Sequence, residues 1–210
     1  MNKERETFLF WKSLESSVES MYLNPRGKDI DTEEKGEILS YLPDLKGKKI
    51  LDLASGIGRF TKIFSSQASH LTTVDMIPQF VEKNKESHIE CRNVTFICSD
   101  AMHLQIEDQS FDFIFLNWLF MYLEDEEVSV LMDRIQRWLK PKGDLFFRES
   151  CSACRKKSPL SGYVAHYRDL LYYDEAVKKR FFLVKEGHIK AHVDAFANPF
   201  QCFWLCKKIL

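Results

Sequence analysis

Apolar and polar positions alternate with two different periods along the middle of the chain. Short apolar runs, typical of buried strands, are separated by longer stretches in which apolar residues recur every three or four positions. Strands that alternate with helices indicate a parallel sheet covered on both faces. The predicted strands are 49–53, 71–75, 94–98, 111–116 and 144–148, and the predicted helices between them are 60–66, 79–87 and 126–139.

The last of these helices shows the helical pattern most clearly. Asp125 is placed to cap its first turn, and the Pro-Lys-Gly run at 141–143 ends it. Its apolar face is made, at spacings of three and four, by Val128, Leu131, Ile135 and Leu139.

The first part of the chain differs from this repeating core. Residues 6–22 predict one amphipathic helix, and residues 32–42 predict a second, short helix that ends before Pro43. We expect residues 1–45 to form a helical lid on a single domain that spans residues 1–210. The apolar positions of the first helix are Phe8, Trp11, Leu14, Val18 and Met21.

The last part of the chain predicts how the sheet is closed. After a polar loop and a Tyr-rich segment at 163–173, two strand-like runs follow at 181–193 and 201–208, with Asn198-Pro199 in the turn between them. A dinucleotide-binding fold would instead add another parallel strand and helix. A C-terminal antiparallel hairpin indicates the class I S-adenosylmethionine-dependent methyltransferase fold, a Rossmann-like α/β domain with a seven-stranded sheet.

Composition narrows the class of protein. The chain has 210 residues, 45% of them hydrophobic, and a net charge of −1. These values suit one domain with a sizeable core and give no electrostatic case for nucleic-acid binding, so the basic run at 155–157 is expected to be a solvated loop. No apolar run approaches the roughly 20 residues that span a membrane, and the charged first residues do not resemble a signal peptide. Scattered cysteines fit a reducing compartment, so we expect a cytoplasmic protein. We also expect a monomer.

Two short spacings raise the question of a metal site. Cys151 and Cys154 make one Cys-x-x-Cys pair, whereas a structural zinc site needs about four ligands. His188 and His192 are four apart, but they fall in a predicted strand, which would not place them side by side as a helix would. We expect no metal.

The turn after the first predicted strand carries the first candidate chemistry. Gly56 and Gly58 lack a Cβ and leave room for a ligand, and the amides of the following helix point into the same space. Asp52 ends the strand, where a carboxylate would repel a phosphate. This acid favours a cofactor without phosphate, S-adenosylmethionine, whose methionine ammonium it can meet. Arg59 belongs to the same cofactor-binding turn, and Ala54 replaces the first glycine of the usual methyltransferase pattern.

Acidic residues also follow the next two predicted strands. Asp75 can accept hydrogen bonds from both ribose hydroxyls, or alternatively cap the helix that begins at Pro78. Asp100 can accept the adenine amino group. Ligands in open α/β sheets bind at the carboxyl ends of the strands, so these acids, with Asn117 after the fourth strand, together indicate an S-adenosylmethionine site. The adenine ring would lie between Met76, Ile77, Ala101 and Met102.

Several blocks of the chain carry a family likeness, namely residues 33–34 with 42–43, 56–61, 117–123, 146–151 and 166–168. They resemble the phosphoethanolamine N-methyltransferases, most closely the first methyltransferase domain of the plant and nematode enzymes. The blocks Asn-Trp-Leu-Phe-Met-Tyr-Leu and Phe-Phe-Arg-Glu-Ser-Cys are specific, whereas the glycine turn is shared by many methyltransferases. The resemblance implies methylation of phosphoethanolamine to phosphomonomethylethanolamine on the route to phosphocholine.

The resemblance also implies roles for residues outside the cofactor site. Tyr122 is the leading candidate to orient the amine or accept its proton, with Tyr22 contributing from the lid; the alternative for Tyr122 is packing beneath the first helix. The single-domain protozoan relative has a histidine at the position of Tyr122, so its Tyr–His pair is not transferred. Trp11 and Trp118 would form walls. The substrate phosphate would bind Arg148, His166, Tyr167 and Arg168, although Arg168 could instead pair with Asp169.

Other functions remain open at this point. A methyltransferase for another small amine or acid would keep the same core and differ only in residues 8–30 and 150–175. A domain that binds the cofactor without turnover is the non-enzymatic alternative. An RNA methyltransferase would need a basic surface, which the charge balance does not indicate.

Overall fold

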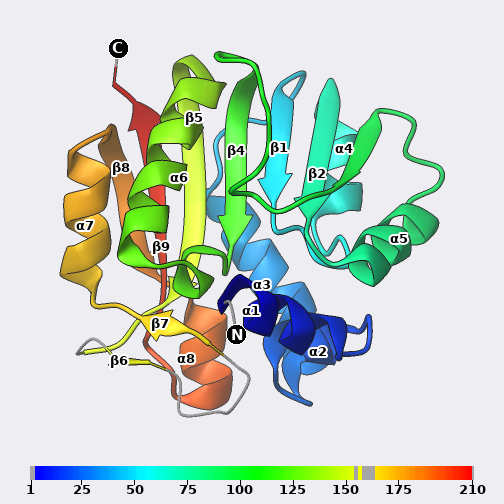
Figure 1. Ribbon diagram of the computed structural model, residues 1–210, viewed down its shortest axis with the longest axis vertical. Helices are drawn as coiled ribbons and strands as arrows, with labels where there is room; N and C mark the ends of the chain where they lie inside the picture. Colours follow the sequence, from blue (N-terminus) through cyan, green and yellow to red (C-terminus); the bar gives the residue numbers. More distant parts are fainter. Residues whose placement is uncertain (1–2, 154–155, 158–163, 210) are drawn as a thin grey trace.

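The computed structural model describes residues 3–153, 156–157 and 164–209 (Figure 1). Seven strands form one sheet in the order β3-β2-β1-β4-β5-β9-β8, and a short β6-β7 pair stands apart from it. The strands are β1 (Lys49–Leu53), β2 (His70–Asp75), β3 (Val94–Cys98), β4 (Phe111–Asn117), β5 (Leu139–Ser150), β6 (Lys156–Lys157), β7 (His166–Tyr167), β8 (Phe181–His188) and β9 (Gln201–Lys208).

The direction of the strands follows the predicted pattern. Strands β1 to β5 pair in parallel, whereas β9 is antiparallel to both of its neighbours, β5 and β8. The five predicted core strands are all present, and β8 and β9 close the sheet as a hairpin. These features confirm the class I methyltransferase fold.

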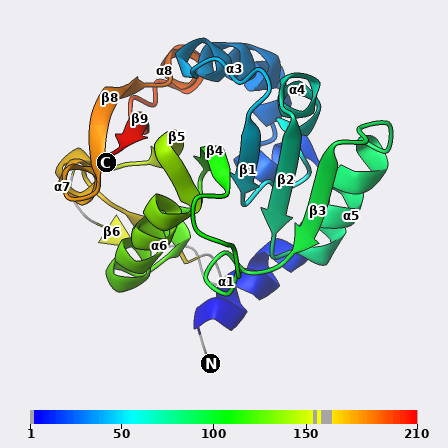
Figure 2. The same cartoon turned by 90° about the horizontal axis from the view of Figure 1, so that it is seen from above.

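Helices cover both faces of the sheet, as Figure 2 shows from above. One apolar core lies between the sheet and α6 with α7, and a second lies between the sheet and α3, α4 and α8. The helix α5 contacts β2 and β3. The bounds are α3 (Gly27–Tyr41), α4 (Thr61–Gln67), α5 (Pro78–Ser87), α6 (Asp125–Trp138), α7 (Leu170–Lys178) and α8 (Lys190–Phe196).

The strand β5 contributes to both cores in turn. Phe146 lies in the core under α3 and α8, and Phe147 lies in the core under α6 and α7. Side chains alternate between the faces of a strand. Arg148 and Glu149, the next two residues, therefore leave the sheet on opposite faces, and both are fully buried.

The first predicted helix is wrong in extent, because it is broken into α1 (Lys3–Lys12) and α2 (Val18–Tyr22). Serines cause the break. The Ser13 hydroxyl donates to the Phe10 carbonyl (2.7 Å), and Ser17 caps α2 by accepting from the Ser20 amide (3.2 Å). Serine side chains that bond the local backbone favour caps over helix interiors. Figure 1 shows α1 and α2 across the carboxyl ends of the parallel strands.

The predicted strand at 181–193 is also wrong in part, since β8 ends at His188 and α8 begins two residues later. A carboxylate from another helix supports the start of α8. Glu37 of α3 accepts hydrogen bonds from the amides of Lys190 (2.7 Å) and Ala191 (2.9 Å). His192 therefore lies on a helix, which local periodicity did not predict.

Three smaller points complete the comparison. Glu124, with Glu127 in a capping box, caps α6 in place of the predicted Asp125. No group of three or more potential ligands is placed to hold a metal among the residues that the structure describes, and Cys154 and Arg155 lie outside them. Within the same residues, no helix is long and apolar enough to cross a membrane.

Candidate active site

A cavity of about 370 Å³ opens at the carboxyl ends of the parallel strands. Residues of α1 and α2 and of the loops after β1, β2, β3 and β4 form its wall. The predicted site residues that line it are Trp11, Asp52, Gly56, Arg59, Asp75, Met76, Asp100, Ala101, Asn117, Trp118 and Tyr122. Those that lie outside the wall are Tyr22, Gly58, Arg148, His166, Tyr167 and Arg168.

The turn after β1 contains three residues with left-handed backbone conformations, two of which are glycines. Gly56 and Gly58 have φ values of +55° and +83°, and Ala54 adopts +55° without being a glycine. A Cβ on Gly58 would lie 2.0 Å from Oδ1 of Asn84 on α5. Gly58 is therefore needed to pack the turn on α5, whereas Gly56 lines the cavity.

Asp75 joins this turn to the end of β2. Its Oδ2 accepts from the Gly56 amide (2.8 Å) and its Oδ1 from the Ile77 amide (2.9 Å). Burial raises the pKa of Asp75 to about 6, although the two amides act in the opposite direction. Asp75 does not cap α5, whose N-cap residue is Ile77. Asp75 also lines the cavity.

Two further carboxylates stand in the same wall. Asp52 is buried, and its pKa is raised well above the ordinary value by burial and then by the nearby charge of Asp75. Asp100 is half-buried after β3 and accepts from the Met102 amide (2.8 Å), which shapes the loop that carries Ala101. An acidic, enclosed site of this kind favours a cationic ligand over a phosphate.

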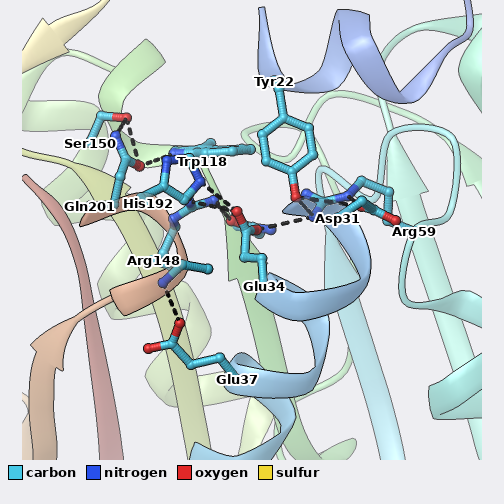
Figure 3. A network of polar contacts seen from close by, with 12 residues as sticks. Tyr22, Asp31, Glu34, Glu37, Arg59, Trp118, Arg148, Ser150, His192 and Gln201 are labelled. Atoms are coloured by element: carbon cyan, nitrogen blue, oxygen red, sulfur yellow. Dashed lines mark hydrogen bonds and ion pairs between the residues drawn. The ribbon is translucent and has the colours of Figure 1, made fainter. Parts of the chain in front are cut away.

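Arg59 is the one lysine or arginine that lines the cavity in the part of the chain that the structure describes. Its Nε donates to Asp31 (2.7 Å), and its Nη2 donates to Glu34 (3.0 Å) and to the Tyr22 hydroxyl. Figure 3 shows these side chains converging from α2, α3 and the turn after β1. Two carboxylates thus balance the charge of Arg59 and fix its position.

Tyr22 belongs to this cluster rather than to the cavity. Its hydroxyl lies between Arg59 and Asp31, 3.5 Å from the Asp31 Oδ1 atom. Burial raises the pKa of Tyr22, although Arg59 acts in the opposite direction. The predicted catalytic role of Tyr22 is therefore not supported by its position, because its hydroxyl binds the arginine that lines the cavity.

Behind this cluster, Glu34 and Arg148 form a fully buried ion pair (Figure 3). Oε2 of Glu34 lies 3.2 Å from Nη2 of Arg148 and 2.5 Å from Nε2 of His192. Burial would raise the pKa of Glu34, but Arg148 and the His192 hydrogen bond hold it well below its ordinary value. Arg148 also donates to Asn117 Oδ1 (2.9 Å) and stacks 3.5 Å from the ring centroid of Trp118. Arg148 supports the cavity wall from behind and does not itself line the cavity.

An aromatic wall closes the other side of the cavity. Tyr122 lies on the short 3-10 helix η1 (Phe120–Tyr122), and its ring meets the ring of Trp11 edge-on with centroids 5.6 Å apart. Trp118 has a left-handed φ of +62°, and its indole N–H donates to Oε1 of Gln201 (2.9 Å). This hydrogen bond and the stacked arginine hold the Trp118 ring in one orientation.

Arg168 also acts from behind the wall. It is 1% exposed, and it donates to two backbone carbonyls of the loop after β4. Its third contact is with Asp125 (2.8 Å) and not with Asp169, the partner considered from sequence. These contacts leave its guanidinium turned away from the cavity.

Sequence reasoning missed several residues that build this site. Thr7 lies one helical turn before Trp11, lines the cavity and has a buried hydroxyl with no hydrogen-bond partner in the described structure, so helical spacing could have found it. Glu34 and His192 are 158 residues apart in sequence, and no local pattern signals their contact. Glu149 and Gln201, which hold the aromatic wall, were missed for the same reason.

Comparison with known proteins agrees with this geometry. The sequence model of a methyltransferase domain matches residues 51–147. Phosphoethanolamine N-methyltransferase 1 of Triticum aestivum is 39% identical over 216 residues, which cover 95% of this chain and 43% of the wheat protein. The corresponding Caenorhabditis elegans protein is 36% identical over 155 residues, which cover 72% of this chain and 33% of that protein.

A solved structure extends the likeness to three dimensions. The Haemonchus contortus phosphoethanolamine N-methyltransferase 1, in complex with phosphoethanolamine and S-adenosylhomocysteine, matches 100% of this chain with a TM-score of 0.93 and 32% identity. The match covers 50% of the Haemonchus chain, so this chain spans about half the length of its relatives. The chain therefore belongs to the class I S-adenosylmethionine-dependent methyltransferases, as a relative of the phosphoethanolamine N-methyltransferases.

Proposed function

We propose that this chain transfers a methyl group from S-adenosylmethionine to the amine of phosphoethanolamine, giving phosphomonomethylethanolamine, the first methylation on the route to phosphocholine. The observation that carries the proposal is the match of the whole chain to the Haemonchus contortus enzyme that holds phosphoethanolamine. The 39% identity with the wheat enzyme over 95% of this chain supports the same acceptor.

The cofactor side of the cavity fits S-adenosylmethionine, which supplies an electrophilic methyl group on a sulfonium. Asp75 would accept from the ribose hydroxyls, and Asp100 and Ala101, which line the same cavity, would bind the adenine. Asp52 can meet the methionine ammonium, and Arg59 its carboxylate. All these residues line the same cavity.

The aromatic side of the cavity suits the amine. An alkylammonium resembles lysine, with a pKa of roughly 10, and must lose its proton before its lone pair can form the new N–C bond while the S–C bond breaks. Tyr122, which lines the cavity, would orient the amine or accept that proton. Trp11, which packs edge-on against Tyr122, and Trp118, which lines the same cavity, would exclude water from the amine. Holding the two reacting atoms in line supplies a large part of the rate enhancement.

The phosphate would bind beside Tyr122. The strand β7 carries His166 and Tyr167 and contacts η1, and Tyr167 packs with Tyr122 around Met121. His166 is buried, with its Nε2 3.5 Å from a carboxylate oxygen of Glu124. We therefore propose that His166 and Tyr167, whose strand adjoins η1, donate to the phosphate, because Arg148 and Arg168 already bind protein acceptors.

A mass-resolved methylation assay tests this function. Phosphoethanolamine, its mono- and dimethyl forms, and ethanolamine without the phosphate are each incubated with the protein and S-adenosylmethionine. We expect product from phosphoethanolamine and none from ethanolamine, because the phosphate is part of what is recognised. Product from phosphoethanolamine alone among the three phosphobases would support the first-step assignment.

A methyltransferase for another small amine is the second candidate. It is favoured by the acidic cavity wall, which includes Glu124 and Glu127 and suits an amine without a phosphate. Equal turnover of ethanolamine and phosphoethanolamine would favour this candidate over the first.

A further inference from the structure

Hydrogen bonds to its backbone N–H groups hold the loop after β4 in place. Each N–H of residues 118–124 has an acceptor within the protein. Four of these N–H groups donate to the carbonyls of Arg148, Leu119 and Phe120 and to the Glu127 side chain. The other three donate to Glu149. Such a loop needs no water to satisfy its backbone, which suits a site from which water is excluded.

One buried carboxylate receives three of these N–H groups. Oε1 of Glu149 accepts from the amides of Leu119 (3.0 Å) and Phe120 (2.7 Å), and Oε2 accepts from the amide of Met121 (3.1 Å). Glu149 is 0% exposed. Because three successive N–H groups share this one buried side chain, Glu149 anchors the start of η1.

A buried guanidinium holds the same loop by its carbonyls. Arg168 donates to the carbonyls of Phe120 (2.8 Å) and Leu123 (2.5 Å), and its Nε binds Asp125 at the start of α6. The carboxyl group of Glu149 thus binds N–H groups of the loop, and the guanidinium of Arg168 binds two of its carbonyls.

The opposite face of β5 supports the same loop from the other side. Arg148 and Glu149 are neighbours in sequence and leave the strand on opposite faces. Arg148 stacks on the ring of Trp118, and Glu149 binds the three residues that follow it. Three sequence blocks that seemed separate, 117–123, 148–151 and 166–168, therefore form one physical unit.

We propose that Glu149, together with Arg168, is a positioning residue for methyl transfer, which sets the loop so that Trp118 and Tyr122 face the amine of the acceptor. Neither Glu149 nor Arg168 lines the cavity, so neither is a catalytic residue. A residue that only stabilised the core would affect both sides of the cavity, whereas a positioning residue affects the acceptor side alone. Only the identity of the acceptor rests on the proposed function.

The test uses Glu149→Gln, which keeps the size of the side chain and replaces one acceptor oxygen with an NH2 group that cannot accept from the loop amides. The loss of an acceptor for the loop amides should lower kcat/KM for phosphoethanolamine by about tenfold or more, while the Kd for S-adenosylmethionine stays within about twofold. In protein labelled with 5-fluorotryptophan, the 19F signal of Trp118, assigned with Trp118→Phe, should shift or broaden while those of the other three tryptophans stay unchanged. Glu175→Gln removes an exposed carboxylate on α7 and should change neither readout.

Arg168→Lys is the second variant, since it keeps the charge and removes the planar set of donors. It should give the same pattern as Glu149→Gln. The proposal is overturned if both variants leave kcat/KM and the Trp118 signal unchanged, or if cofactor affinity falls in parallel with turnover. If the wild-type protein does not methylate phosphoethanolamine, the proposed function fails, whereas the 19F comparison still decides the role of Glu149.

Discussion

Two arginines show why a motif can be recognised while its role is misjudged. Arg148 and Arg168 were assigned to the substrate phosphate because a guanidinium binds phosphate bidentately. Both are at most 1% exposed and donate to protein acceptors instead. A buried guanidinium is stable only where acceptors surround it. Its partners, such as Glu34 and Asp125, are far away in sequence, so no local pattern reveals them.

The cofactor acids are the opposite case. Asp52, Asp75 and Asp100 each follow a strand that the apolar pattern predicted, and parallel strands bring their carboxyl ends to one edge of the sheet. Topology alone therefore places all three in the cavity, where the structure has them. Residues whose place depends on side-chain pairing, such as Glu34 and Glu149, could not be predicted in this way.

At the residue scale, Tyr122→Phe tests the amine site. Removing the hydroxyl should lower kcat by about a hundredfold if it accepts or relays the proton. The Kd for S-adenosylmethionine should stay within about twofold, because the ring that packs on Trp11 is kept. Steady-state kinetics and calorimetry measure the two quantities.

Tyr41→Phe is the matched control for this variant. Tyr41 lies at the end of α3, where it stacks on Phe203 and donates to Glu37, away from the cavity. The Tyr41→Phe variant should therefore leave kcat unchanged. Turnover of Tyr122→Phe close to that of the control would remove the Tyr122 hydroxyl from the mechanism.

At the scale of elements, the helices and strands that follow from the local apolar pattern were predicted, whereas one that depends on a distant contact was not. The alternating strands and helices of the core were predictable because each buries one face or stripe on the sheet. The helix α8 was not, because its first amides are satisfied by Glu37 of α3, more than 150 residues earlier in the chain. The break between α1 and α2 was predictable in principle from Ser13 and Ser17.

The N-terminal helices give the prediction at this scale. We propose that α1 and α2 act as a lid, because Thr7 and Trp11 of α1 and Met21 of α2 line the cavity at the carboxyl ends of the strands. Deletion of residues 1–25 should abolish turnover, since the cavity is then open to water. The shortened protein should still unfold cooperatively, because Glu34 and Arg148 remain paired in the core. Activity assays and thermal melts followed by circular dichroism measure both effects, and an active shortened protein would exclude a lid.

At the scale of the whole molecule, one buried polar network joins parts of the chain that are distant in sequence. It links α2 and α3 to the turn after β1 through Arg59, and to β5 and α8 through Arg148 and His192 (Figure 3). Breaking a buried ion pair by removing one partner typically costs about 3–5 kcal/mol. The network is therefore expected to fix how the N-terminal helices sit on the sheet.

Buried carboxyls give a prediction for the stability of the cofactor-free protein. Burial raises the pKa of Asp75 to about 6 and that of Glu149 to about 7. A carboxyl with a raised folded-state pKa stabilises the fold fully below its unfolded pKa, and this contribution is lost as the pH rises through the folded pKa. The free energy of unfolding should therefore fall between about pH 4.5 and pH 7.5, by about 1.4 kcal/mol for each unit of pKa shift.

Urea unfolding at a series of pH values measures this slope. Asp75→Asn combined with Glu149→Gln should flatten it, whereas Glu175→Gln should not. The pKa of Glu34 is held well below its ordinary value, so Glu34 makes the free energy of unfolding rise with pH instead of fall. Its stabilising contribution is lost only in stronger acid, as the carboxylate becomes protonated. A wild-type stability that is flat or rises over the same range would contradict the assignment.

The close placement of Asp52 and Asp75 in the cavity wall also links cofactor binding to pH. Each carries a raised pKa in the cofactor-free protein, whereas an ammonium or ribose hydroxyls beside them would favour their charged forms. In the proposed binding mode, loading the cofactor would therefore release protons. By the same linkage, acidification of the surrounding medium would lower the fraction of protein that is loaded, even at a constant supply of S-adenosylmethionine.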